Sequence, residues 1–436
     1  MPSLGSAAGQ GGRRVAIVAG VRTPFARAGT TLKHLTAIEL GKLAVAELIQ
    51  RTNLDADLVE LIVYGTVVPS VIAPNIAREV SLMPMLPRGC DAYSVSRACA
   101  SANQAITDAA DQIVLGHRDV VIAGGAESLS NVPILHSRSM SEKLVALSRA
   151  KNVGQRIGLL SSIRPRDLIP ITPAIAEPST GETMGQSAEK MAKLNHIARE
   201  EQDQFALRSH RLAAVGTEDG RLTSEIVPAY VPPKYDVVLT SDNGIRTDTS
   251  IEQLRALKPV FDRKYGSVTA GNSSPLTDGA SAVLLMSEER AETLGYRPLA
   301  FIRSYAYSAL DPGEQLLMGP VLAAPVALQR AGLALADIDL FEMHEAFAAQ
   351  VLSNLQGFES REWARRAGFS EPLGEIDRSR LNVMGGSISI GHPFGATGGR
   401  ILTTLANELI RRGGQFGMMT VCAAGGMGHA MVIERA

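Results

Sequence analysis

The two halves of this sequence repeat one local pattern, and this repeat constrains the fold more than any other feature. Each half carries a reactive side chain, a stretch of helical periodicity, a short apolar run typical of a buried strand, and a glycine-rich turn. The segments are Cys99, 100–115, 119–123 and 124–126 in the first half, and His392, 399–412, 418–422 and 424–426 in the second. We interpret the repeat as a duplicated α/β unit whose halves share one site, although α/β proteins also repeat such units by coincidence.

A third region separates the two halves. Residues 129–249 contain few strand signals, several prolines and a strongly helical stretch at 183–212, so we interpret them as an insertion that covers the site. The predicted domains are an N-terminal half (14–128 and 250–287), an inserted loop domain (129–249) and a C-terminal half (288–436).

Charge and cysteine content exclude several functional classes. Lys plus Arg (43) nearly equals Asp plus Glu (44), so we expect no nucleic-acid partner. Cys90, Cys99 and Cys422 are widely spaced and lack metal-ligand spacing, which predicts no disulfide framework, no bound metal and a reducing compartment. Residues 1–14 lack the apolar core of a secretory signal, and no run reaches the roughly 18 apolar residues of a membrane span. We therefore expect a cytoplasmic protein.

Cys99 is the first candidate for chemistry. It lies in the sequence SRACASA (96–102), where small neighbours leave room for a substrate to reach the sulfur. The helical pattern begins directly after it, so the helix dipole and free N–H groups are expected to favour the thiolate. A buried structural cysteine is the alternative, and this segment alone does not decide between them.

His392 and Cys422 are the next candidates. His392 lies in GHPFGATG (391–398), where the glycines and the proline fix the backbone and uncover the ring, so the imidazole could take a proton from Cys99. Cys422 ends a strand-like run and enters the turn CAAGGMG (422–428), whose N–H groups could form an oxyanion hole. A second thiol suits carbon-acid chemistry, and a buried cysteine at a strand end fits the pattern equally well.

The last candidate is the segment HEAFA (344–348), which follows the apolar run 340–343. Either His344 or Glu345 could point into a site at this strand-to-helix junction. Glu345 alone is more typical of a carboxylate at a helix start. No second histidine follows four residues later, which excludes the zinc-protease motif.

In combination, these segments resemble the thiolase family. Matching order and spacing are found for Cys99, HEAF (344–347), GHP (391–393), CAAGG (422–426), VRTPF (21–25) and AGNSS (270–274). The resemblance covers about residues 14–434. It implies an α/β fold with five layers (αβαβα), made of two similar halves with an inserted, mainly helical loop domain. It also implies cleavage of 3-ketoacyl-CoA by coenzyme A, or the reverse Claisen condensation, with CoA as a substrate and no cofactor.

The resemblance assigns a role to each candidate residue. Cys99 would carry the acyl group and His392 would activate it. Cys422 would protonate the departing acetyl-CoA enolate and later deprotonate the incoming CoA. Backbone N–H groups of Cys99 and Ala424 would stabilise the tetrahedral intermediate, and Ser274 matches the family's serine beside the pantetheine arm of CoA.

His344 departs from the common family pattern. Most thiolases carry Asn at this position, and that Asn holds a water for the thioester oxygen. A histidine at this position resembles the branch of the family that forms the β subunit of the fatty-acid β-oxidation complex. In that case His344 would either donate a hydrogen bond to the oxyanion directly or hold the water molecule in a different way. That branch implies a complex with an α subunit carrying hydratase and 3-hydroxyacyl-CoA dehydrogenase activities, and we also expect a homodimer.

The insertion contains a basic, amphipathic segment at 136–166. Its cations, set against the single acid Glu142, are Arg138, Lys143, Arg149, Lys151, Arg156, Arg164 and Arg166. Basic amphipathic helices are typical of surfaces that meet a membrane or a partner. The family resemblance implies, more specifically, long-chain substrate entry, docking of the α subunit or peripheral membrane contact. A solvated helical face packed on the core is the alternative.

Three other functions compete with this interpretation. A decarboxylating ketoacyl synthase uses one Cys and two His, but it would leave Cys422 without a role. A biosynthetic acetoacetyl-CoA thiolase is disfavoured by His344 and the long insertion. A non-catalytic CoA-binding scaffold subunit would not need all four reactive side chains.

Overall fold

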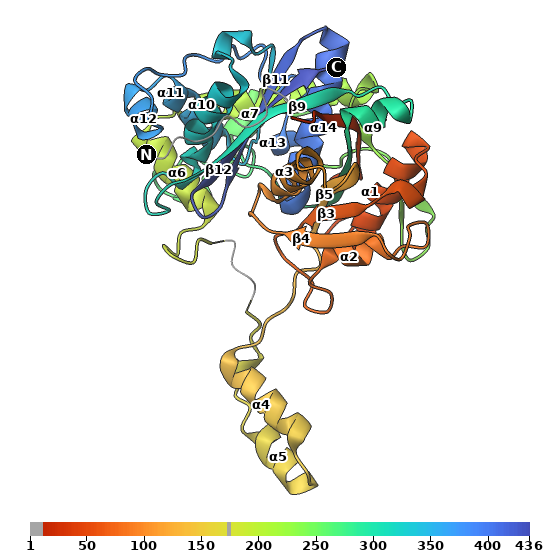
Figure 1. Cartoon of the computed structure of the whole chain (residues 1–436). Coiled ribbons are helices and arrows are strands. Elements are labelled where there is room, and N and C mark those ends of the chain that lie inside the picture. Colours follow the sequence, from red (N-terminus) through yellow and green to blue (C-terminus); the bar gives the residue numbers. More distant parts are fainter. Residues whose placement is uncertain (1–11, 172–175) are drawn as a thin grey trace.

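The main sheet consists of two parts with the same plan (Figure 1). The computed structural model describes residues 12–171 and 176–436. The first part has the strand order β1-β8-β5-β3-β4 and the second has β9-β12-β11-β10; the two parts join where β1 pairs with β9. Their bounds are β1 (Val15–Arg22), β3 (Leu61–Gly65), β4 (Asp91–Val95), β5 (Val120–Ser128), β8 (Thr277–Ser287), β9 (Ala300–Ala309), β10 (Leu340–Met343), β11 (Phe416–Ala423) and β12 (Met427–Arg435), with the short β2 (Ala26–Arg27) paired to β8.

Strand directions confirm the duplication. In the first part β1/β8 and β8/β5 are antiparallel and β5/β3 is parallel. In the second part β9/β12 and β12/β11 are antiparallel and β11/β10 is parallel. The order along the chain also corresponds, because β1, β3, β5 and β8 match β9, β10, β11 and β12 in turn.

The helices complete five layers, as predicted. Between the two parts of the sheet, α3 (Ser101–Val114) and α14 (Thr397–Arg412) pack against each other. The outer face of the first part is covered by α1 (Ala37–Thr52) and α2 (Ile76–Ser81), and that of the second by α10 (Gly319–Ala331), with α11 (Ala348–Phe358) beside it. Because α3 and α14 lie between sheets, both are buried over most of their surface, and their small residues permit this close packing.

One local prediction was wrong. Residues 124–126 were expected to form a turn, yet β5 continues through them to Ser128, and their two glycines have another role. They are needed for close backbone approach instead: a Cβ on Gly125 would overlap the carbonyl oxygen of Gly395, in the loop that leads into α14. The corresponding turn at 424–426 does form, with Gly425 and Gly426 at φ +83° and +70°.

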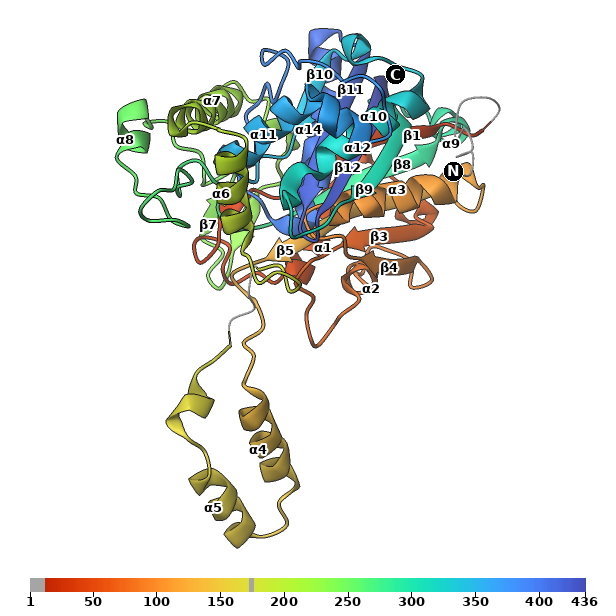
Figure 2. The same cartoon turned by 90° about the vertical axis from the view of Figure 1, so that its left-hand side faces the viewer.

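The insertion is mainly helical and has two parts. The first is a hairpin of α4 (Arg138–Arg149) and α5 (Val153–Ser161), which projects from the body (Figures 1 and 2). The second returns to the body through α6 (Met184–Leu194), α7 (Arg199–Glu218), β6 (Ala229–Val231) and β7 (Val237–Leu239). The domain boundaries proposed above stay predictions. Within the described ranges, no helix has the length and apolarity that crossing a bilayer requires.

Four shorter helices complete the fold. They are α8 (Ile251–Arg255), α9 (Glu288–Thr293), α12 (Arg361–Arg366) and α13 (Ser387–Ile390). The last of these leads directly to His392 and matters most for the site.

Candidate active site

Cys99 lies in a tight turn between β4 and α3. The preceding residue, Ala98, has φ +44°, a left-handed conformation that is uncommon for any residue except glycine. Ser101 stabilises the turn: its Oγ accepts a hydrogen bond from the N–H of Arg97 (2.8 Å) and donates one to the carbonyl of Ala98 (2.7 Å). The strained residue next to the candidate nucleophile was not foreseen from the sequence, because alanine carries no signal for this conformation.

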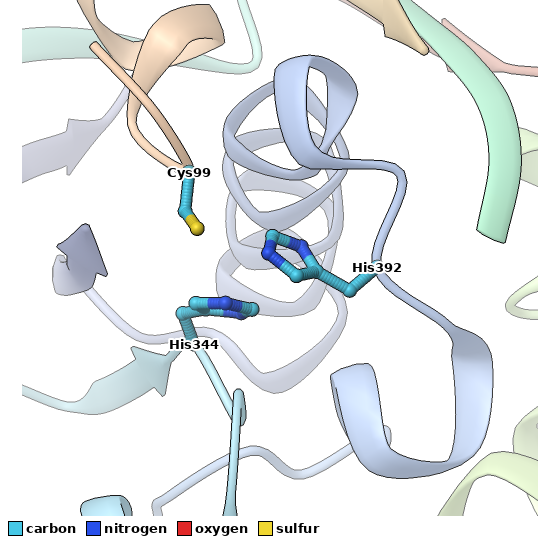
Figure 3. A group of neighbouring side chains, drawn as sticks. All are labelled: Cys99, His344 and His392. Atoms are coloured by element: carbon cyan, nitrogen blue, oxygen red, sulfur yellow. The ribbon is translucent and has the colours of Figure 1, made fainter. Parts of the chain in front are cut away.

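Two histidines from the second half face Cys99 (Figure 3). His344 directly follows β10, and His392 lies in the loop between α13 and α14. One ligand atom from each of the three side chains lies within 4.8 Å of the others. The structure therefore brings together residues that stand 245 and 293 positions after Cys99 in the sequence (344 − 99 and 392 − 99).

Burial keeps all three groups neutral. It raises the pKa of the Cys99 thiol to about 12, although the neighbouring backbone N–H groups of Ala424 and of Cys99 itself lower that pKa in part. Burial lowers the pKa of His392 to about 3, with a smaller contribution from the Arg400 charge, and lowers the pKa of His344 well below its usual value. Burial thus acts against the thiolate that the start of α3 was expected to favour, and the thiolate stays a prediction.

Each imidazole is held at its Nδ1 atom by a hydroxyl group. Nδ1 of His344 lies 2.9 Å from Oγ of Ser387, and Nδ1 of His392 lies 2.6 Å from Oγ1 of Thr397. The Nε2 atoms of both rings are buried and have no hydrogen-bond partner among the described residues. Both Nε2 atoms are therefore available to a substrate or to the Cys99 sulfur.

Cys422 and the turn that follows it border the same space. Cys422 is buried in β11, and burial raises the pKa of its thiol well above the usual value, with a smaller contribution from the neighbouring Cys99. The N–H of the next turn residue, Gly425, donates to Glu177 from the insertion (2.8 Å). The backbone N–H of Ala424, in the same turn, lies near enough to the Cys99 thiol to lower its pKa, so this turn borders the nucleophile candidate.

Glu345 does not enter the site, which resolves the ambiguity at the strand-to-helix junction. Its carboxylate accepts hydrogen bonds from Ser209 in α7 (2.7 Å), from Asn382 (2.7 Å) and from the N–H of Ile388 in α13 (3.2 Å). Glu345 therefore ties the inserted domain and α13 to the segment that carries His344.

Glu127 is a second structural carboxylate that sequence reasoning missed. It is fully buried in β5 and accepts hydrogen bonds from the N–H groups of Val67 (2.9 Å), Val68 (2.9 Å) and Gly395 (3.0 Å). Gly395 lies only three residues after His392, so Glu127 anchors the loop that carries the histidine. An acid inside an otherwise apolar strand was the available signal, because such a residue is rarely buried without partners.

A cavity of about 290 Å³ lies beside the site. Its lining includes Arg27, Arg246, Ser273 and Ile388. Ser274, the residue predicted to lie near CoA, is half-buried and donates its backbone N–H to Ala346 (2.9 Å), while its neighbour Ser273 lines the cavity. Arg27 and Arg246 contribute two cations to the lining against the single carboxylate of Asp248, so the cavity suits a ligand that carries negative charge.

The spacing of Cys99, His344 and His392 would also allow a soft metal ion to bind. The expectation that the chain uses no metal and no cofactor therefore stays a prediction.

Comparison with known proteins agrees with the fold. Residues 15–289 match the model of the thiolase N-terminal domain, and residues 296–435 match that of the thiolase C-terminal domain. The chain is 54% identical to a 3-ketoacyl-CoA thiolase of Pectobacterium atrosepticum and 52% identical to one of Aeromonas salmonicida, each over 424 residues and 97% of both chains.

Solved structures give the same picture. The acetyl-CoA acetyltransferase of Bacillus anthracis superposes with a TM-score of 0.83 at 33% identity, covering 98% of this chain and 100% of that one. Human mitochondrial 3-ketoacyl-CoA thiolase gives 0.82 at 32% identity, covering 97% and 99%.

The duplicated five-layered fold, the thiol and two imidazoles at its centre, and the matches to both thiolase domains together define an acyltransferase. Both family models match, and together they span nearly all of the described chain. The chain belongs to the thiolase family.

Proposed function

We propose that this chain is a 3-ketoacyl-CoA thiolase of fatty-acid β-oxidation, which cleaves 3-ketoacyl-CoA with CoA to acetyl-CoA and a shortened acyl-CoA. The observation that carries the proposal is the convergence of the Cys99 thiol with the imidazoles of His344 and His392, whose ligand atoms lie within 4.8 Å of one another. Identity of 50–54% to curated 3-ketoacyl-CoA thiolases over nearly the whole chain supports this substrate class.

Acylation begins with a neutral thiol and a neutral imidazole. His392 accepts the Cys99 proton at Nε2 while the sulfur attacks the 3-keto carbon, and the N–H groups of Cys99 and Ala424 stabilise the resulting oxyanion. The C2–C3 bond then breaks. Its electron pair moves onto the thioester of the departing acetyl-CoA as an enolate, and Cys99 retains the acyl group as a thioester.

Cys422 completes the first half-reaction and starts the second. Its thiol donates a proton to C2 of the enolate, which releases acetyl-CoA. The Cys422 thiolate then accepts the proton of the incoming CoA thiol. The CoA sulfur attacks the acyl carbon, and Cys99 leaves as a thiolate that recovers its proton from His392.

The cavity beside the site supports CoA as the ligand. CoA carries phosphate groups, and Arg27 and Arg246 supply cations at the cavity wall. Ser273 and Ser274 lie where the cavity approaches the segment that carries His344, because Ser274 hydrogen-bonds Ala346. We assign the pantetheine arm to this passage.

Thiolysis of 3-ketoacyl-CoAs of graded chain length tests the function. We expect turnover by the wild type and a loss of roughly 10³-fold or more in Cys99→Ala. Retained activity in Cys99→Ala, together with its loss in Cys422→Ser, would overturn the assignment of the nucleophile. Activity limited to acetoacetyl-CoA would favour the biosynthetic alternative.

We further propose that the projecting hairpin, residues 136–166, serves complex assembly with an α subunit or peripheral membrane contact. One face of α5 presents Val153, Ile157 and Leu160 with 70%, 62% and 52% of their surfaces exposed. Their spacing of four and three residues places them on one stripe of the helix. An exposed apolar stripe flanked by cations suits a partner surface or an anionic lipid layer.

The cations of the hairpin allow a direct test. Arg149, Lys151 and Arg156 are exposed, whereas the ion pairs of the hairpin engage Arg138 and Lys143. Reversal of all three to Glu should weaken pull-down of the α subunit or sedimentation with anionic liposomes. A control triple reversal on the body, at the exposed residues Arg297, Arg361 and Arg365, should change neither. Equal binding by both triple variants and the wild type would remove the role of the hairpin.

A homodimer is the third part of the proposal. The outer strand β4 has one unpaired edge, and four of its five residues are only half-buried. A second copy that pairs its own β4 would cover this edge with twofold symmetry. Light scattering should give about twice the chain mass of 46.2 kDa. A monomer mass would contradict this proposal.

All three cysteines are free thiols, which supports a reducing compartment such as the cytoplasm.

A further inference from the structure

We propose that Ser387, together with Arg400, fixes His344 as the neutral tautomer that carries its proton on Nε2. In this form His344 is a hydrogen-bond donor to the thioester oxygen of the substrate. Ser387 and Arg400 are then positioning residues, which act on the reaction only through His344. The identity of the oxygen rests on the proposed function, whereas the tautomer rests on the protein's own hydrogen bonds.

The first step concerns what Ser387 can do with its hydroxyl proton. Nη2 of Arg400 donates to Oγ of Ser387 (3.3 Å), and a guanidinium has donors only. Arg400 is itself buried and held in place by Glu342, whose Oε2 lies 3.4 Å from Nη1. Among the described residues, Nδ1 of His344 is the one acceptor within hydrogen-bond distance of the Ser387 hydroxyl (2.9 Å). The hydroxyl proton therefore points to His344.

The second step follows from the chemistry of a neutral imidazole. One ring nitrogen carries the proton and the other accepts. His344 is neutral because burial lowers its pKa, and the charge of Arg400 lowers it further. Since Nδ1 accepts from Ser387, the proton resides on Nε2, the buried atom that has no partner among the described residues. A buried donor without an acceptor is costly, and a substrate oxygen would satisfy it.

His392 has the opposite arrangement. The hydroxyl of Thr397 has a second acceptor, the carbonyl oxygen of Pro393 (3.5 Å), so Oγ1 can accept from Nδ1 of His392 (2.6 Å). Nε2 of His392 is then unprotonated, as a base for the Cys99 thiol requires. Two rings that look alike in Figure 3 thus differ in the position of one proton, and this difference separates a donor from a base.

The effect on the reaction is electrostatic. When the C2–C3 bond breaks, the electron pair moves to the thioester oxygen, and the N–H of His344 stabilises the charge that develops there. The proton stays on Nε2 throughout, so no atom is transferred. A donor that strengthens its bond only as charge develops raises kcat more than it lowers KM.

Nuclear magnetic resonance of the wild-type protein tests the tautomer directly. In the full chain with ¹⁵N-labelled histidine, long-range proton–nitrogen correlation distinguishes Nε2–H from Nδ1–H. The chain has eight histidines, and His344→Asn identifies the signal that disappears. We expect His344 to be protonated at Nε2. Protonation at Nδ1 would overturn the inference whatever the enzyme proves to catalyse.

Kinetics of Ser387→Ala test the consequence. We expect kcat for thiolysis to fall by about 10- to 100-fold with KM nearly unchanged. Alkylation of Cys99 by iodoacetamide should keep the wild-type rate, because it depends on His392 and not on His344. Ser387→Thr, which retains the hydroxyl, should recover most of the activity.

A matched control separates this effect from general damage. Ser389 lies in the same short helix and is equally buried, but its hydroxyl meets the carbonyl of Gly386 (3.0 Å) and the hydroxyl of Ser209 (2.9 Å) and no imidazole. Ser389→Ala should keep wild-type kcat. An equal fall of kcat in both variants, or a fall of the alkylation rate in Ser387→Ala, would show a packing effect and overturn the inference. Absence of thiolysis in the wild type would contradict the proposed function. The tautomer of His344 would then be tested by nuclear magnetic resonance alone.

Discussion

The imidazole rings of His344 and His392 lie with their centroids 4.1 Å apart and their planes tilted by 47°. At this separation two positive charges would repel each other strongly in a buried site. Only one of the rings can therefore hold an extra proton at a time. When His392 takes the proton of Cys99, His344 must stay neutral, and a fixed donor tautomer meets that requirement.

The acylation step should be insensitive to pH in the range where ordinary histidines titrate. The pKa of His392 lies near 3, so its imidazole is neutral above that value and can accept a proton at any mildly acidic pH. For a histidine with the usual pKa of about 6.5, the fraction of neutral imidazole would fall about tenfold between pH 7.5 and 5.5. Single-turnover acylation should change less than about twofold over that range. A tenfold decline centred near pH 6.5 would contradict the buried, neutral His392.

Gly125→Ala should be strongly destabilising. The new Cβ would overlap the backbone carbonyl oxygen of Gly395, and backbone cannot move aside as a flexible side chain can. We expect a loss of about 3 kcal/mol in the free energy of unfolding, and reduced activity because the loop carrying His392 is displaced. Chemical denaturation measures the first effect. Gly158→Ala in α5 is the control, since no atom lies within 4 Å of its Cβ and the change should be neutral or slightly stabilising.

Glu127→Gln tests the anchor of the same loop. The carboxylate accepts three backbone N–H groups and the hydroxyl of Thr66, whereas an amide NH₂ would face one or more of these donors. An unsatisfied buried donor costs about 1–3 kcal/mol, so the midpoint of denaturation should fall clearly. Glu218→Gln, at an exposed position in α7, should leave the midpoint unchanged. Equal denaturation midpoints for Glu127→Gln and Glu218→Gln would show that Glu127 does not anchor the loop.

The left-handed residue before the nucleophile gives a graded prediction. Ala98→Gly should preserve both stability and activity, because glycine adopts φ +44° without steric penalty but loses more entropy on folding. Ala98→Val should lower stability by about 2 kcal/mol and slow alkylation of Cys99, because a branched side chain resists this conformation and the turn would shift. Thermal denaturation and iodoacetamide kinetics provide the two measurements. An Ala98→Val variant as reactive as the wild type would show that the turn does not depend on this residue.

The duplicated units could be predicted because their signals are local. Helical periodicity over 100–115 and 399–412 reports the amphipathic surfaces of α3 and α14 without knowledge of any partner. The turn after β11 was also predictable, since two consecutive glycines have few other uses. The same signal failed in β5, where Gly125 accommodates the carbonyl of a residue 270 positions later (395 − 125). A prediction from local sequence cannot detect a contact between residues so far apart in the chain.

The site shows the same division. Motif spacing identified Cys99 and His392 as chemical groups, but their protonation states depend on burial, which the sequence does not display. His344 could be identified as unusual, whereas its partner Ser387 stands 43 positions away in the chain and is recognisable only once the two side chains meet. Glu127 could be noticed in the sequence as an acid in an apolar strand. Its role becomes clear only from the three backbone N–H groups that donate hydrogen bonds to its carboxylate.

Because β1-β8-β5-β3 and β9-β12-β11-β10 follow one plan, the entrances of α3 and α14 are equivalent places in the two halves, yet they hold Cys99 and His392. In a symmetric assembly of identical halves these places would carry the same side chain. Two like groups bind a proton equally well and define no direction for its transfer. Because both halves belong to one polypeptide, the residues at the two helix entrances can differ. The difference between Cys99 and His392 gives the proton transfer a direction, from the thiol to the imidazole.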